Sequence, residues 1–182
     1  MNIIGEVLVA RFKIEELVGE GATGTVFSAT DQVLGRKVAI KLLKPDLAHD
    51  PKFVERFQRE ACIIAQLSLN PHVVSVYDIG KTTEGLPFLI TEFLTGHPLT
   101  QEVNSTYRPA TSWLLGVGSR IAFALVDAHR RGVIHRDLKP ANVFVVRTGV
   151  VPLFIKVLDF GLSRSDQIPM SPEYATLPAT LQ

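Results

Sequence analysis

Apolar and charged positions alternate along the first third of the chain. The segment 11–18 alternates apolar Phe12 and Ile14 with charged side chains and then meets a glycine-rich stretch. The segment 25–30 is rich in β-branched residues, and the segment 36–43 puts every second, apolar side chain on one face. A two-residue period of this kind is typical of half-buried strands. Because the connections are short, the pattern predicts three antiparallel strands in a meander.

A helical period follows. Asp50 suits the N-cap of a helix and Pro51 suits its first turn. Apolar residues then recur at the spacing of one helical face. Two further strands are predicted at 73–80 and 87–94. The first part of the chain is therefore expected to form a five-stranded antiparallel sheet with one helix.

The pattern changes near residue 95, so we divide the chain into two lobes, 1–94 and 95–182. In the second lobe, 112–132 is predicted to be a helix with a glycine at its end. Strands are predicted at 143–146 and 153–158. The fold class that follows is α+β and two-lobed.

Composition narrows the classes of function. The chain has 182 residues, of which 46% are hydrophobic and 20% charged, as in a globular protein with a core. Its net charge of +1 gives no basic field for nucleic acid, so we expect no nucleic-acid partner. The single cysteine, Cys62, fits a reducing compartment, and we expect a cytoplasmic protein. No apolar run approaches the ~18 residues of a membrane span, so we expect no membrane segment in this chain.

The stretch from Gly19 to Val26 holds glycines at 19, 21 and 24. Such a loop lets backbone N–H groups approach phosphate oxygens, although a tight hairpin turn explains it about as often. A dinucleotide-binding fold needs a helix directly after the glycines, whereas here a strand follows. The context favours a flap that covers a ligand.

A carboxylate interrupts the apolar face of the first predicted helix. At the helical period, Phe53, Phe57, Glu60 and Ile64 fall within about a 60° arc. A carboxylate buried there needs a cation or it becomes neutral. Lys41, on the third strand, is the predicted partner, although a lysine on a strand is often simply exposed. Such a pair would also place an ammonium where it can meet phosphate oxygens.

Polar residues of the second lobe lie between apolar segments. Mg²⁺ takes one or two protein oxygens together with phosphate and water oxygens. Asn142 and Asp159 fit this role if the intervening strands pair as a hairpin. Asp137 is then left as a base or a hydroxyl-orienting group, and Lys139 supplies a cation beside a transferring phosphoryl group. Taken alone, the triplet Asp-Phe-Gly at 159–161 is more often a turn.

Together these stretches resemble the eukaryotic-like protein kinases, and most of all the bacterial serine/threonine branch. The resemblance covers about residues 5 to 163. The stretches that match, in the family's order, are Gly19-Glu20-Gly21-Ala22-Thr23-Gly24-Thr25-Val26, Val38-Ala39-Ile40-Lys41, Glu60, His135-Arg136-Asp137-Leu138-Lys139-Pro140-Ala141-Asn142 and Asp159-Phe160-Gly161.

The resemblance implies ATP and Mg²⁺ as cofactors and a protein bearing Ser or Thr as substrate. The first lobe would hold the ATP-binding sheet and a regulatory helix, and the second lobe the catalytic loop and the start of the activation segment. The residues implied for ATP binding are Val18, Gly19, Glu20, Gly21, Ala22, Thr23, Gly24, Val26, Ala39, Lys41, Thr91, Glu92 and Leu94. Catalytic roles are implied for Asp137, Lys139, Lys41 and Glu60, and metal binding for Asn142 and Asp159.

The family's second lobe normally continues well past the length of this chain, so we expect an incomplete, mainly helical second lobe. Apolar surface on helix 112–132 would then lack cover, and we expect weak stability, self-association or dependence on a missing segment. The rival function is a truncated or pseudokinase module that binds ATP for regulation without turnover. A third reading, a small-molecule phosphotransferase, is disfavoured by Lys139.

Overall fold

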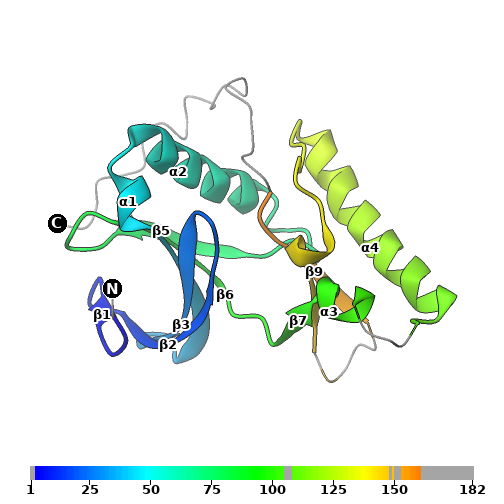
Figure 1. The fold of residues 1–182 in the computed structure, drawn as a ribbon, viewed down its shortest axis with the longest axis horizontal. Helices are drawn as coiled ribbons and strands as arrows, with labels where there is room; N and C mark the ends of the chain where they lie inside the picture. Colours follow the sequence, from blue (N-terminus) through cyan, green and yellow to red (C-terminus); the bar gives the residue numbers. More distant parts are fainter. Residues whose placement is uncertain (1–2, 105–107, 148, 150–152, 161–182) are drawn as a thin grey trace.

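Two antiparallel sheets organise the chain in a computed structural model that describes residues 3–104, 108–147, 149 and 153–160 (Figure 1). The larger sheet has the strand order β1-β2-β3-β4-β6-β5. Its strands are β1 (Val7–Leu8), β2 (Phe12–Glu20), β3 (Gly24–Asp31), β4 (Arg36–Leu43), β5 (Val76–Lys81) and β6 (Pro87–Glu92).

The predicted count of five strands was wrong by one, because β1 adds a sixth. β1 has two residues and pairs Leu8 with Phe12 across a tight turn. The turn residues Val9 and Ala10 take the left-handed conformation, with φ of 44° and 54°. A two-residue strand is too short to leave a periodic pattern, and its turn lacks the glycines that usually mark such backbone.

The alternation on β4 appears in the structure as predicted. Val38 and Ile40 are fully buried and Leu42 nearly so, within the main core of the larger sheet. Lys41 lies on the opposite face. The strand spans Arg36–Leu43, the predicted range, because period-two alternation is a local property that the sheet preserves.

The predicted helix is α2 (Pro51–Gln66), and a short helix that was not predicted, α1 (Pro45–Ala48), precedes it. The Asp50 carboxylate accepts a hydrogen bond from the backbone N–H of Lys52 at 2.9 Å, as expected of an N-cap. Phe57, Glu60 and Ile64 are buried. Helix α2 lies along one face of the sheet (Figure 1).

The strand predicted at 73–80 begins three residues later, at Val76. Val73 and Val74 leave the larger sheet and contact the smaller one instead. Val73 forms a parallel bridge with Val157, and the N–H of Val74 donates to the carbonyl of Val157 at 3.2 Å. Both valines are buried in the core that underlies the second lobe. The β-branched side chains of Val73 and Val74 predict an extended segment, but they do not indicate which sheet that segment joins.

The smaller sheet has the order β7-β8-β9, with β7 (Gly96–Pro98), β8 (Val143–Val146) and β9 (Phe154–Val157). β8 and β9 form the predicted hairpin, whereas β7 occupies the expected lobe boundary. Gly96 has φ of 152°, and a Cβ there would collide with the carbonyl of Val145. Strand β7 can therefore lie against β8 only because residue 96 is a glycine.

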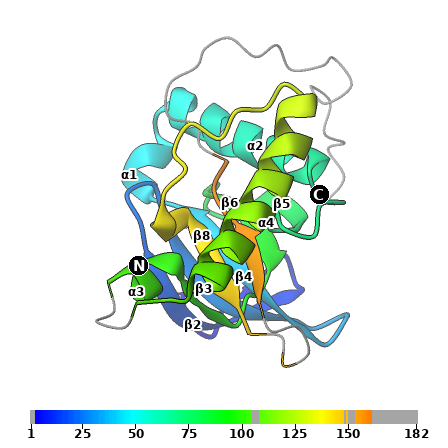
Figure 2. The same ribbon diagram turned by 90° about the vertical axis from the view of Figure 1, so that its right-hand side faces the viewer.

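Helix α4 (Thr111–Arg130) is the long helix of the second lobe, and α3 (Leu99–Val103) and the 3₁₀ turn η1 (Pro140–Asn142) are short. Figure 2 shows α4 crossing in front of the smaller sheet. Val117 and Ala128 of the predicted stripe are buried, and Gly132 follows the helix with φ of 73°. Another face of α4 is apolar and exposed; it carries Leu114, Leu115, Phe123 and Val126.

Among the helices in the described ranges, none is both long enough and apolar enough to cross a bilayer. The predicted start of the activation segment, including Gly161, lies outside the described residues.

Candidate active site

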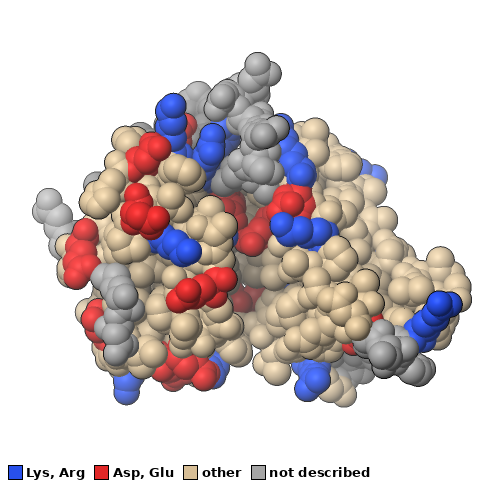
Figure 3. Space-filling model, in the orientation of Figure 1, with Lys and Arg blue, Asp and Glu red and all other residues tan. Residues whose placement is uncertain are grey.

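Two adjoining cavities of about 530 and 460 Å³ lie between the sheets and meet at Lys41 and Asp159. Figure 3 shows the hollow between the two halves of the molecule, with acidic side chains inside it. Every site residue that the sequence predicted lines one of the two cavities. Residues that are distant in the chain thus share one cleft, as a site for a ligand with two chemically different ends requires.

The larger of the two cavities holds most of the charged side chains, and we call it the polar cavity. It lies under the glycine-rich loop and contains the predicted acids and amide. Its predicted members are Gly21, Ala22, Thr23, Gly24, Val26, Lys41, Glu60, Asp137, Lys139, Asn142 and Asp159. The sequence reasoning missed Leu43, Phe53, Arg56 and Phe57 as lining residues. Phe53 and Phe57 belong to the apolar stripe predicted for α2. This stripe also carries Glu60, so the sequence could have indicated that both phenylalanines face the cleft.

The smaller cavity has mainly apolar walls. Its predicted members are Val18, Gly19, Glu20, Gly21, Val26, Ala39, Lys41, Thr91, Glu92, Leu94 and Asp159. Phe93, within the stretch 91–94 that the resemblance implies for the pocket, also lines it. The sequence reasoning did not assign the other wall residues, which are Ile64, Val74, Leu89, Pro98, Ala141, Phe144 and Leu158. A slot of this kind suits a flat, apolar ring with a few polar atoms at its edge.

The glycine-rich loop is the turn between β2 and β3. The N–H of Gly21 donates to the carbonyl of Gly24 at 2.8 Å and closes the turn. A Cβ at Gly24 would lie 2.7 Å from the carbonyl oxygen of Leu42, so this glycine is required by the packing of β3 on β4. A Cβ at Gly19 would meet no atom within 4 Å. Packing within the fold therefore does not require a glycine at residue 19, and the open space there leaves room for a ligand.

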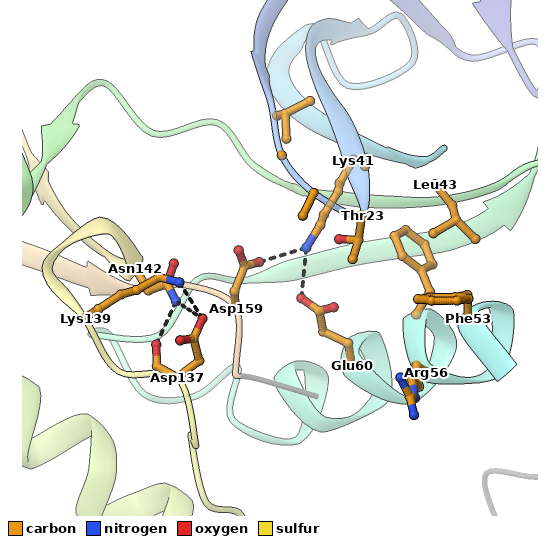
Figure 4. A pocket seen from close by; sticks show the side chains of 15 residues that line it. Thr23, Lys41, Leu43, Phe53, Arg56, Glu60, Asp137, Lys139, Asn142 and Asp159 are labelled. Atoms are coloured by element: carbon orange, nitrogen blue, oxygen red, sulfur yellow. Dashed lines mark hydrogen bonds and ion pairs between the residues drawn. The ribbon is translucent and has the colours of Figure 1, made fainter. Parts of the chain in front are cut away.

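Lys41 is bonded to two carboxylates. Its Nζ lies 3.0 Å from Glu60 Oε1 and 2.9 Å from Asp159 Oδ1 (Figure 4). Strand β4 supplies the lysine, α2 supplies Glu60, and the segment after β9 supplies Asp159. The sequence predicted the first pair, whereas the second carboxylate on the same ammonium comes from the fold. One cation therefore joins three elements at the junction of the cavities.

These three groups shift one another's protonation. Burial raises the pKa of Glu60 to about 7, although the Lys41 ammonium opposes the rise. Burial favours a lower pKa for Lys41, but the two carboxylates outweigh it and raise that pKa. Burial likewise favours a raised pKa for Asp159, but Lys41 outweighs it, so the pKa of Asp159 is lowered. Asp159 and Lys41 are thus charged at neutral pH, and Glu60 is poised between its two forms.

The raised pKa of Glu60 predicts a pH dependence of stability. The folded pKa of about 7 lies above the ordinary value of 4.5, so between these values the native state binds more protons than the unfolded state. The stabilisation is fully present below pH 4.5 and is lost as the pH rises through 7. We expect wild type to lose about 1–3 kcal/mol of unfolding free energy relative to Glu60→Gln between pH 5 and pH 8.

Urea unfolding at four pH values in this range measures the difference. Glu55→Gln, an exposed carboxylate on the same helix, is the matched control and is expected to follow wild type. A constant difference between wild type and Glu60→Gln across the range would contradict the assignment of the raised pKa to Glu60.

Asp137 forms a second cluster with two neighbours in the loop before β8. Its Oδ2 accepts from Lys139 Nζ at 2.8 Å and from Asn142 Nδ2 at 3.1 Å, and Asn142 Nδ2 also donates to the carbonyl of Asp137 at 2.8 Å. The hydrogen bond from Lys139 is the main reason that the pKa of Asp137 is lowered. Asp137 is therefore an ionised acceptor, better suited to hold and orient a hydroxyl than to act as a strong base.

The β8–β9 hairpin brings Asp159 beside this cluster. Val143 pairs with Val157, and the N–H of Leu158 donates to the carbonyl of Asn142 at 2.8 Å. The buried ring of His135 contacts the residues on either side of Asp159. Its Nε2 contacts the carbonyl of Leu158 at 3.0 Å, and its ring centre lies 4.7 Å from that of Phe160.

The backbone is strained at two residues beside the cleft, both in the second lobe. Arg136, directly before Asp137, has φ of 60°, and Asp159 has φ of 43°. Few residues other than glycine adopt this conformation without a cost, and such outliers gather at functional sites. Arg136 directly precedes Asp137, and Asp159 is itself one of the acids that the sequence singled out.

The donor set fits a magnesium ion shared with a substrate. The described residues contain no group of three or more His, Cys, Asp or Glu side chains that could enclose a metal. Asn142 uses its amide nitrogen on Asp137, which leaves its oxygen available, and one oxygen of Asp159 is free of Lys41. Two protein oxygens suit Mg²⁺, which keeps water and phosphate oxygens as its other ligands.

The comparisons with known proteins agree with this geometry. The family model described as "Protein kinase domain" matches residues 12–180. Serine/threonine-protein kinase pkn3 of Myxococcus xanthus is 37% identical over 161 residues, which are 88% of this chain and 29% of that protein. PknA of Mycobacterium tuberculosis is 36% identical over 173 residues, which are 92% of this chain and 39% of that protein.

Among solved structures, the PknI kinase domain of Mycobacterium tuberculosis superposes with a TM-score of 0.74 at 29% identity. The match covers 90% of this chain and 64% of that chain. The chain therefore spans well under half the length of the two curated relatives and about two thirds of the solved domain.

Proposed function

We propose that this chain, which belongs to the protein kinase domain family, transfers the γ-phosphoryl group of ATP to Ser or Thr hydroxyls of proteins. The observation that carries the proposal is the single ammonium of Lys41, bonded to both Glu60 and Asp159 at the junction of an apolar and a polar cavity. A nucleotide has the same two ends, a flat apolar base and a charged phosphate chain.

The smaller cavity suits adenine. Val18, Val26 and Ala39 would cover the ring, with Thr91 at the back wall. The backbone of Glu92 and Leu94 would pair with its polar edge. The N–H of Glu92 already donates to the carbonyl of Ser75 at 3.0 Å, so the carbonyl of Glu92, which also accepts from the Thr91 hydroxyl at 3.3 Å, is the Glu92 group that would meet adenine. The residues at 19–24 would cover the phosphates from above.

The polar cavity suits the phosphate chain and the acceptor hydroxyl. Lys41 would hold phosphate oxygens, and Glu60 would fix the position of its ammonium. Asp137 would accept a hydrogen bond from the substrate hydroxyl, and Lys139 would lie beside the group in transfer. Asn142 and Asp159 would hold Mg²⁺, which when bound neutralises charge on the phosphate oxygens.

The acceptor class rests on the relatives. The two curated relatives described above are named serine/threonine-protein kinases, and Lys139 follows Asp137 by two residues, as in that branch. We infer a cytoplasmic location from the need for ATP and from the single cysteine, Cys62. The extent of the two lobes, 1–94 and 95–182, and self-association through the second lobe remain predictions.

The test is intact-mass measurement of the purified chain after incubation with ATP, with Mg²⁺ or with excess chelator, together with a generic protein substrate. We expect additions of phosphate with Mg²⁺ and none with chelator. Nucleotide binding without any phosphate transfer would favour the rival function, a regulatory module that binds ATP. Absence of ATP binding would contradict the proposed function itself.

A further inference from the structure

A buried lysine of β9 forms an ion pair that the proposed chemistry does not use. Lys156 is 7% exposed, and its Nζ lies 2.6 Å from Glu92 Oε1. The same Nζ donates to the carbonyl of Val73 at 3.0 Å. A charged lysine within an apolar strand is costly to bury, so the fold must gain something from its partners.

The ammonium of Lys156 joins three segments. The first is the end of β6, where Glu92 begins the segment 92–94. This segment lines the smaller, apolar cavity, and we call it the base-facing strip. The second is the segment at 73–75, because Ser75 donates its N–H to the same Glu92 oxygen at 2.7 Å. The third is β9, which continues through three residues to Asp159. The pair therefore ties the base-facing strip to β9, the strand that leads into Asp159 at the phosphate end of the cleft.

Stability alone is a poor reason for such a pair. Replacing a buried ion pair by apolar residues of similar volume is often neutral or even stabilising. The pair does, however, fix the relative position of two elements that are 64 residues apart in the chain. Backbone hydrogen bonds from Val74 to Val157 and from Val157 to His72 hold β9 to the 72–75 segment, and the N–H of Glu92 donates to the carbonyl of Ser75 in that segment. Among the described residues, the Lys156 side chain is what bonds β9 directly to Glu92.

We propose that Lys156 and Glu92 are positioning residues that hold the base-facing strip and the phosphate-facing Asp159 in register, so that one nucleotide contacts both ends of the cleft. The inference rests on the proposed function. A ligand held at two rigid anchors gains affinity from their alignment, and it loses that gain when the anchors move independently. A ligand that uses one anchor does not depend on the alignment.

The experiment compares ADP with adenosine, because adenosine lacks the phosphates that reach the Lys41 end. Calorimetry measures the dissociation constants of both ligands for the 182-residue chain and for Lys156→Met. We expect ADP binding to weaken about tenfold, equivalent to ~1.4 kcal/mol, while adenosine binding changes less than about twofold. The double variant Lys156→Met/Glu92→Gln leaves no buried charge unpaired, so it provides a folded form if the single variant unfolds.

Arg11→Met is the matched control. It breaks the ion pair, at 2.7 Å, between Arg11, directly before β2, and the fully buried Asp31 at the end of β3. Neither residue is among the described residues that line the two cavities. This variant is expected to lower the melting temperature and to leave the ratio of the ADP and adenosine dissociation constants unchanged.

Three outcomes would overturn the inference. If the ratio in both Lys156 variants equals that of wild type, the pair does not align the two ends. If both ligands weaken equally, the pair supports the base-facing strip alone. If wild type binds neither ligand, the proposed function fails as well, which the first two outcomes leave intact.

Discussion

Replacing Asp137 with asparagine is expected to remove almost all phosphate transfer while nucleotide binding in the presence of Mg²⁺ persists. Asp137 lies at the edge of the polar cavity, bonded to Lys139 and Asn142 and not to Lys41. The amide of the variant can still accept a hydrogen bond from Lys139, so the loop is expected to keep its shape. What is lost is the charge that holds the acceptor hydroxyl, an effect of about 10²–10⁴ in rate.

Turnover and nucleotide affinity, measured on the same preparation, separate the two roles. Asp127→Asn is the matched control, because this aspartate lies on α4 and pairs with Arg131 at 3.3 Å outside the cavities. The control is expected to keep the wild-type rate. A variant at residue 137 that turns over normally but no longer binds nucleotide would assign Asp137 to binding instead.

Replacing Lys41 with methionine is expected to weaken both folding and nucleotide binding. The change removes the cation that two carboxylates share and leaves Glu60, a residue 9% exposed, without its partner. Breaking a buried pair by removing one member typically costs about 3–5 kcal/mol. Because Asp159 is partly open to solvent, its share of the loss is smaller than that of Glu60.

Urea unfolding and calorimetry with ADP measure the two losses. Lys37→Met is the matched control on the same strand, since Lys37 forms exposed pairs with Glu15 and Glu16. Exposed pairs contribute about 0–1 kcal/mol, so this variant is expected to resemble wild type. If Lys41→Met and Lys37→Met unfold at the same urea concentration, Lys41 does not hold the junction together.

Several features of the fold and the site follow from the sequence because they depend on local patterns. The range of β4 follows from strict alternation, and the start of α2 follows from Asp50 and Pro51. The pair of Lys41 and Glu60 follows from one observation, a carboxylate in the middle of an apolar helical face. A buried charge needs a partner of opposite charge, and this requirement can be inferred without knowing the fold.

The tertiary structure decided what depends on pairing between distant segments. β1 and β7 are too short to show a period, and Val73 and Val74 are extended residues whose partner strand lies more than 80 positions away. Asp159 reaches Lys41 across 118 positions, which no spacing rule in the sequence encodes. Lys156 is a lone lysine within a predicted apolar strand, and this pattern could have indicated a buried ion pair. Its partner, Glu92, is set by which strand ends meet in the fold, because contacts between side chains on different elements depend on packing rather than on local order.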